Sequence, residues 1–226
     1  MAIALDTVSE DNGSGSSLTI SHTCSADTTK LVVGVACIDS NDVNRPVTGI
    51  TYNGVALTKI DSSDTGAGTS ESAELWYLDS PATGSAHDCV VSTTGTVQIL
   101  AGVISLEGTD TGVDASNTSN GSSSDSECAV TTVAANCWVV DALGSEPNVT
   151  SENEMGTIRW EQDPQTYQTG AGATSGPHAA STAVTHGYAH AYGARWRMVI
   201  ASFAPAAAPT GIASLRQLVG HGQGTR

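Results

Sequence analysis

The sequence predicts an all-β protein, an antiparallel β-sandwich of jelly-roll type. Three observations predict it: short runs of alternating apolar residues, frequent turn residues between them, and an Asn-Gly pair inside such a run. The pair is Asn53-Gly54, at the centre of a hairpin predicted over residues 49–60. Both central positions of a type I′ turn need a positive φ, which Asn tolerates and Gly adopts freely, so the pair is a strong hairpin signal.

The segments before and after the hairpin repeat this pattern. Residues 31–38 are apolar on both faces, which is typical of a central strand of a sandwich. Residues rich in Gly, Ser and Asn predict a turn-rich lead-in over 1–16 and exposed loops over 109–126 and 163–176. Alternating or apolar runs predict further strands over residues 18–24, 73–78, 88–93, 97–106, 128–132, 137–143, 157–162, 180–188 and 195–203.

The end of the chain differs in composition from the sandwich. Residues 206–211 are rich in Pro and Ala, which predicts a stiff linker. Apolar residues then recur at helical spacing, so residues 212–226 are predicted to form a short amphipathic helix and a tail. A helix this short needs a surface to dock on, because it is unstable alone in water. The predicted units are a sandwich domain over 1–205, the linker, and a helix whose docking residues are Ile212, Leu215, Leu218 and Val219.

Composition and charge exclude several classes of function. The formal net charge is -15, with 8 Lys and Arg residues in all, so the chain lacks the basic clusters that bind nucleic acid. The same charge would be repelled by an anionic membrane, and no apolar run approaches the ~20 residues of a membrane span. The first residues have no basic region ahead of an apolar one, so we expect no signal peptide and assembly in a cytoplasm.

The cysteines give no metal or disulfide pattern. Five are present, an odd number without a C-x-x-C pair, so zinc ligation has little support. Cys37 and Cys137 lie in strand-like runs and are expected to be small buried hydrophobic residues. The spacing leaves any disulfide pairing open. The full set is Cys24, Cys37, Cys89, Cys128 and Cys137, and we expect no cofactor.

The serines and histidines of the sequence fit structural roles better than catalytic or metal-binding ones. No Gly-x-Ser-x-Gly elbow opens a helix, so the many serines are expected to be solvated loop residues. His186 and His190 would share one face of a strand and could bind a metal with His178 or an Asp as third ligand. We favour surface histidines and no metal site, because local residues do not complete a ligand set.

The acidic and aromatic residues likewise fit structural roles. Three groups of loop acids could form a calcium site or a pair of glycosidase carboxylates, but we expect them to be solvated. The Trp residues lie on strand patterns and are expected to pack in the core, whereas a glycan-binding module would expose such rings on one face. The acids are Asp39 and Asp42 with Asn41, Asp61 and Asp64, and Glu152 and Glu154.

Several segments together resemble a family of β-sandwich domains in bacteriophage structural proteins and related uncharacterised bacterial and metagenomic proteins. The resemblance spans about residues 17–205 and implies a fold rather than a catalytic site, while residues after 209 lie outside it. It is carried by residues 21–24, 30–35, 47–58, 74–78 with 81–84, 101–110 and 196–205.

The resemblance leads to a functional expectation. We expect a non-enzymatic phage virion protein, most of all one that decorates the outside of the capsid. Its partners would then be the major capsid protein or neighbouring copies in a homo-oligomer, with no nucleic acid and no membrane. The alternative is a receptor-binding or glycan-binding module of a tail fibre or adhesin, with a host-surface glycan as partner.

Overall fold

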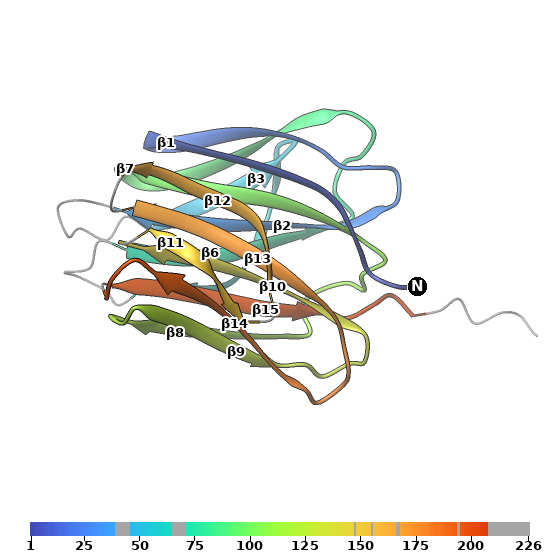
Figure 1. Ribbon diagram of the computed structural model, residues 1–226. Coiled ribbons are helices and arrows are strands. Elements are labelled where there is room, and N and C mark those ends of the chain that lie inside the picture. The colour runs from blue at the N-terminus through green and yellow to red at the C-terminus, as the bar shows by residue number, and fades with distance from the viewer. Residues whose placement is uncertain are drawn as a thin grey trace, which may run out of the picture.

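The computed structural model describes residues 1–38, 46–64, 71–146, 148–154, 156–165, 168–193 and 195–207. Within these ranges the chain forms strands that pair antiparallel in three stacked sheets, which confirms the expected all-β class and its sandwich-like packing (Figure 1). The three sheets contain, respectively, β1 (Ala4–Thr23), β2 (Thr28–Ile38), β3 (Val47–Tyr52), β4 (Val55–Ala56), β5 (Thr58–Ser63), β6 (Glu71–Asp79) and β7 (Ala86–Glu107); β8 (Ala115–Gly121), β10 (Cys137–Ser145), β12 (Thr157–Gln165), β13 (Gln168–His178) and β15 (Trp196–Phe203); and β9 (Asp125–Thr131), β11 (Val149–Glu154) and β14 (Ala183–His190).

The first sheet is organised by two long strands. β1 and β7 pair along their whole length, from Ala4 opposite Glu107 to Thr23 opposite Ala86. The first half of β7 also pairs with β3 and the second half with β2, so the sheet changes neighbours midway and encloses its own core. That core is built from apolar side chains of all these strands, among them Leu18, Val33, Ile50, Val91 and Val103.

Two further cores join the sheets. Apolar residues of β2, β6 and β7 meet those of β10, β12 and β15 between the first and second sheets. Residues of β10, β13 and β15 meet those of β9 and β14 between the second and third sheets. All eight residues of β15 are buried, and all but one of β2 and of β10, because these strands have a core on each face. This matches the expectation for residues 31–38.

Trp160 fixes the spacing of the first and second sheets. Its side chain is 1% exposed and lies against backbone that carries no side chain. A Cβ placed on Gly102 would lie 2.2 Å from the ring, and one on Gly172 would lie 2.1 Å from it. The glycines therefore form the cavity that the indole fills, at a close approach of backbone that no other residue type permits.

The predicted hairpin is present. Asn53 has a φ of 50° and Gly54 a φ of 76°, so both central residues have the positive φ of a type I′ turn. Tyr52 pairs with Val55 across the turn. The second arm is short, because β4 ends at Ala56 and the following strand, β5, pairs with β6 instead.

Three predictions of turns and loops were wrong. The lead-in over 1–16 is part of β1, and its Gly-Ser residues produce a shift of register between Gly15 and Ser17 rather than a turn. The break between the strands predicted over 88–93 and 97–106 is absent, because β7 is continuous from Ala86 to Glu107. The loop over 109–126 contains β8, a polar edge strand that pairs with β15 and has no buried residue. Polar edges of this kind discourage pairing with other chains.

The loop predicted over 163–176 was also wrong, because most of it is strand β13. The residues at its centre are small, Gly170 to Ala173, and they face buried surface on both sides. Larger side chains would collide there: a Cβ on Gly170 would lie 2.7 Å from the Cβ of Leu100. The composition that looked like a loop is what two tightly packed neighbouring layers require.

Cysteines and tryptophans lie where a structural role would place them. All five cysteines are buried and free, so none forms a disulfide. Burial raises the pKa of the Cys37, Cys89 and Cys128 thiols to about 12, which keeps them protonated and unreactive. Trp76 and Trp196, like Trp160, are buried.

The described residues include no helix long and apolar enough to cross a membrane.

Candidate functional site

A polar cluster lies in the core between the second and third sheets. We call it the Asp141 cluster, and it consists of Asp141 on β10, Ser175 and His178 on β13, and His186 and Tyr188 on β14. These side chains come together because side chains alternate between the two faces of each strand. Val139 and Leu143 flank Asp141 on the same face, and Val184 shares a face with His186 and Tyr188, so all of them point into this core.

The cluster is a continuous chain of hydrogen bonds. His186 Nδ1 lies 2.5 Å from Asp141 Oδ2, and its Nε2 lies 2.7 Å from Ser175 Oγ. Ser175 Oγ is also 2.7 Å from Nε2 of His178. The other carboxylate oxygen of Asp141 accepts from the Tyr188 hydroxyl at 2.6 Å and from the backbone nitrogen of Ala173 at 3.0 Å.

These contacts define which group donates each proton. A carboxylate only accepts hydrogen bonds, so His186 donates its Nδ1 proton to Asp141. In the neutral imidazole Nε2 is then an acceptor, and it receives the hydroxyl proton of Ser175. A hydroxyl has one proton, so His178 Nε2 donates to Ser175 Oγ. This series of hydrogen bonds runs from the half-buried His178 to the fully buried Asp141, and each donor in it has an acceptor.

Burial and charge shift the titration of the outer histidine. The pKa of His178 is lowered, first because burial removes hydration of the charged imidazole and then because His186 lies nearby. A neutral His178 can donate one proton from Nε2, as the chain requires. In this arrangement the hydroxyl proton of Ser175 points at His186, a base that the buried Asp141 holds in one orientation.

The structure brings together two of the three histidines that sequence analysis considered for a metal. His178 and His186 both contact Ser175, whereas His190 lies four residues further along β14 and takes no part in the cluster. Contrary to the favoured reading as surface residues, His186 and His190 are buried. The described residues contain no group of three or more side chains that could hold a metal ion.

His190 is expected to make folding sensitive to acid. Its side chain is buried, and burial lowers its pKa to about 4, below the 6.5 of an exposed histidine. Between these values the unfolded chain takes up a proton that the folded chain does not, so stability falls as the pH falls. We expect His190→Leu to remove about 2 to 3 kcal/mol of the stability lost between about pH 7 and pH 4.5, measured by denaturant unfolding.

His22 offers an independent check of the same physics. It is buried on β1 of the first sheet, whereas His190 is on β14 of the third, and burial likewise lowers its pKa to about 4. The His22→Leu change should reduce the acid loss by a similar amount, and the two changes should add because the residues are far apart. An acid loss in the His190→Leu protein equal to that of the unchanged protein would contradict this account.

Sequence reasoning missed three members of the cluster. Asp141 carried a usable signal, because it is a charged residue inside the apolar run from Val139 to Leu143. Ser175 had none, since it stands in a stretch rich in Gly, Ala, Ser and Thr that predicted a loop. It is the last half-buried residue of β13 before the exposed Gly176 and Pro177.

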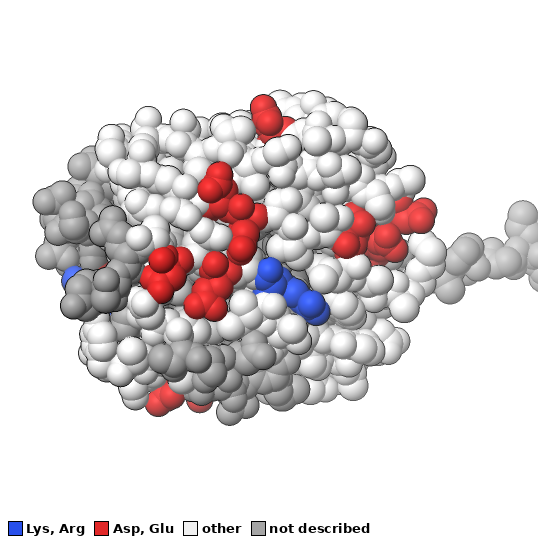
Figure 2. Space-filling model, turned by 45° about the horizontal axis from the view of Figure 1, so that its top comes forward, with Lys and Arg blue, Asp and Glu red and all other residues white. Residues whose placement is uncertain are grey.

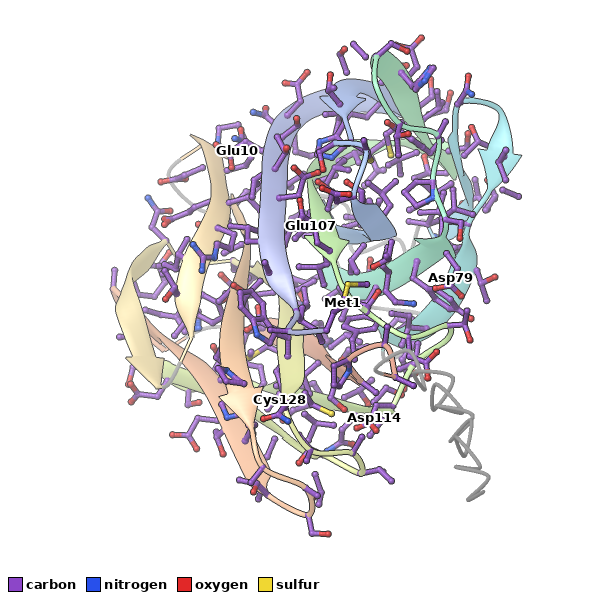
Figure 3. All side chains as sticks on the ribbon, turned by 90° about the vertical axis from the view of Figure 1, so that its right-hand side faces the viewer. Met1, Glu10, Asp79, Glu107, Asp114 and Cys128 are labelled. Carbon is purple, nitrogen blue, oxygen red and sulfur yellow. The ribbon has the colours of Figure 1, made fainter. Side chains whose placement is uncertain are left out.

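A second candidate region is the end of the molecule where the described chain stops, which we call the exit end. Ala206 donates to the carbonyl of Gly108 at 2.8 Å and accepts from the Met1 nitrogen at 3.0 Å. Thr109 forms an isolated bridge with Pro205. The backbone is therefore held firmly up to residue 206, beside the start of the chain (Figures 1 and 3).

The exit end carries a pocket and acidic residues. The pocket has a volume of about 440 Å³ and mostly apolar walls, and Met1 is one of the residues that line it. Figure 3 looks onto this end, with Met1 near the centre and the labelled Asp79, Glu107 and Asp114 around it. Asp110, next to Thr109, is exposed. The residues that line the pocket are Met1, Ala2, Ile3, Asn136, Trp138 and Pro177.

The remaining candidates from sequence analysis occupy varied positions. Asp61 accepts hydrogen bonds from the Ser62 nitrogen and from the Ser116 hydroxyl, and so joins β5 to β8. Asp64 is exposed. Outside the described part of the chain lie Asp39, Asn41 and Asp42, the side chains of Glu152 and Glu154, and the predicted docking residues Ile212, Leu215, Leu218 and Val219.

Comparisons with known proteins identify no relative: no family model, curated protein or solved structure matches this chain. Function is therefore inferred from the two regions described above.

Proposed function

We propose that this chain is a structural protein of a bacteriophage virion that decorates the outside of the capsid in repeated copies. The observation that carries the proposal is the exit end, where the backbone is anchored up to residue 206 beside an apolar pocket. A rigid body that releases an apolar segment from a fixed point can present this segment to a neighbour without reorganising its own core.

Charge supports a neighbouring copy as the partner at this end. Residues 206–226 contain Arg216 and Arg226 and no Asp or Glu, although the whole chain has a net charge of -15. At the exit end, Glu107 lies near Met1 (Figure 3), and the exposed Asp110 donates its backbone N–H to the carbonyl of Ala204. An apolar, basic segment of one copy therefore complements the apolar, acidic end of the next, and complementary charge favours specific association.

The remaining surface fits a protein exposed to solvent in many copies. Figure 2 shows a face on which most residues are uncharged and the acidic side chains gather in a few separate groups. The proposal includes the finer features that the sequence predicts. These are jelly-roll connectivity of the sandwich, and a short helix with a tail over 212–226 that docks on the partner through Ile212, Leu215, Leu218 and Val219.

A truncation tests the docking segment. The protein ending at Ala207 keeps the hydrogen bonds of Ala206 and should stay folded, with an unchanged circular dichroism spectrum. We expect the full chain to form oligomers in size-exclusion chromatography with light scattering, and the truncated protein to be monomeric and to be lost from purified phage particles. Full incorporation of the truncated protein into particles would refute the docking role.

A matched pair of substitutions separates the apolar stripe from the segment as a whole. Leu215→Asp should abolish oligomers and particle binding as the truncation does, because a charge cannot enter an apolar pocket without losing its hydration. Gln217→Asp adds the same charge off the stripe and should leave both unchanged. Quantitative mass spectrometry of particles then gives the location: hundreds of copies indicate the capsid, and a few copies indicate the tail and the receptor-binding or glycan-binding alternative.

A further inference from the structure

Three serines in the described part of the chain lie within hydrogen-bonding distance of a histidine ring. The distances from Oγ to the ring nitrogen are 2.9 Å for Ser9 and His22, 3.1 Å for Ser85 and His87, and 2.7 Å for Ser175 and His186. A serine hydroxyl becomes a nucleophile when such a base takes its proton and a third group orients the base. The pairs therefore differ in whether that third group is present.

Only the pair at Ser175 has a carboxylate on the far ring nitrogen, within the ranges that the structure describes. Asp141 holds His186 Nδ1 at 2.5 Å, while the far nitrogen of His22 is buried without a partner. Asp141 is itself held in place by Tyr188 and by the backbone of Ala173. The imidazole thus has one orientation and one tautomer, with Nε2 free to accept the proton of Ser175.

The surroundings of the imidazole and of the hydroxyl suit a reaction at Ser175. Gly156 lies over the His186 ring, and a Cβ there would come within 3.3 Å of Nδ1. Ser175 is half-buried and is followed by the exposed Gly176 and Pro177, so it lies at the solvent-facing side of the cluster, whereas Asp141 and His186 are buried. His178 Nε2 lies 2.7 Å from Oγ on the other side of the hydroxyl and holds the Ser175 side chain in place.

We propose that Ser175 is a nucleophile that accepts acyl groups from small carboxylic esters, with His186 as its base and Asp141 as the residue that orients the base. Pro177, which follows Gly176 on β13, also lines the pocket of the exit end, but no step of this inference depends on docking there, so it is independent of the proposed virion role. It would revise two expectations from sequence, that the serines are solvated loop residues and that the protein is not an enzyme.

The reaction balances with water as the second substrate. Ser175 Oγ attacks the ester carbonyl carbon as its proton passes to His186 Nε2, and Asp141 stabilises the resulting imidazolium. The carbon–oxygen bond to the alcohol breaks, and the alcohol leaves with the proton from His186. A water molecule then attacks the acylated Ser175, gives a proton to His186, and releases the acid as the serine hydroxyl re-forms with that proton.

The test uses a fluorophosphonate probe, which modifies an activated serine as its oxygen displaces fluoride. We expect intact mass spectrometry of the full-length protein to show one adduct, and peptide mapping to place it on Ser175. The rate there should exceed the rates at Ser9 and Ser85 by at least about tenfold, because only Ser175 has an oriented base. No adduct at Ser175, or equal modification of Ser85, overturns the proposal without any variant having to fold.

Variants then assign the roles. Ser175→Ala should lose the adduct, and the matched Ser85→Ala should keep it. Asp141→Asn should slow modification by about 100-fold or more, because an amide that donates to Nδ1 favours the wrong tautomer of His186. Release of p-nitrophenol from p-nitrophenyl acetate should follow the same order. Unchanged release by Ser175→Ala, or a folded Asp141→Asn protein that reacts at the original rate, would contradict these roles.

Discussion

Trp160→Ala is expected to destabilise this protein by about 3–5 kcal/mol, measured as the free energy of unfolding in urea. The indole is almost completely buried and fills the space between the first and second sheets. Its removal leaves a cavity. The surrounding strands cannot move in to fill it, because hydrogen bonds to their neighbours hold them in their sheets. Trp160→Phe should lose much less, since it keeps most of the apolar contact and removes an indole nitrogen that has no hydrogen-bond partner among the described residues.

A second substitution shows whether the glycine and the indole are a fitted pair. A Cβ added to Gly102 would lie 2.2 Å from the Trp160 ring, and the ring atoms would be its nearest neighbours. Gly102→Ala should therefore destabilise the unchanged protein by about 1–3 kcal/mol through overpacking. In the Trp160→Ala background the added methyl has room, so it should cost little. Equal effects of Gly102→Ala in both backgrounds would show that the indole does not set this spacing.

Asp141→Ala is expected to have an effect of similar size, about 3–5 kcal/mol. The change removes the acceptor for His186 Nδ1, for the Tyr188 hydroxyl and for the Ala173 nitrogen, which all belong to buried residues. Each buried donor left unpaired loses its hydrogen bond without regaining one to solvent. Urea unfolding measures the loss.

Two controls distinguish the network from the loss of a charge. Asp141→Asn keeps an acceptor for Tyr188 and Ala173 and should be clearly more stable than Asp141→Ala. Asp27→Ala removes an exposed acid and should change stability by no more than about 0.5 kcal/mol. If Asp141→Ala were as stable as Asp27→Ala, the cluster would contribute nothing to holding the third sheet on the second.

Local sequence was sufficient where the physical cause is local. The turn at Asn53-Gly54 depends on two residues that accept positive φ, and the structure has it. The burial of β2 on both faces follows from an unbroken apolar run, which is unfavourable on any strand with a solvated face. The predicted strands before and after these elements overlap strands of the structure for the same reason, since alternation indicates a half-buried surface, although the one predicted over 180–188 begins only at Ala183.

Predictions from composition were wrong where a neighbour decides the structure. The residues of β8 have no apolar face, and they form a strand because the free edge of β15 supplies hydrogen bonds for their backbone. The small residues of β13 resemble a loop, yet they are small because Trp160 and the facing sheet leave no room for larger side chains. No pattern within either segment contains this information.

By itself, the sequence determined the all-β class, the hairpin and the core strands, because hydrophobic alternation and backbone preference act over a few residues. Only the tertiary structure decided which polar residues meet. Asp141, Ser175 and His186 come from strands β10, β13 and β14, in two different sheets, and lie up to 45 residues apart in sequence. Their contact depends on the register of β13 against β10 and on the face that β14 turns inward, and long-range pairing sets both.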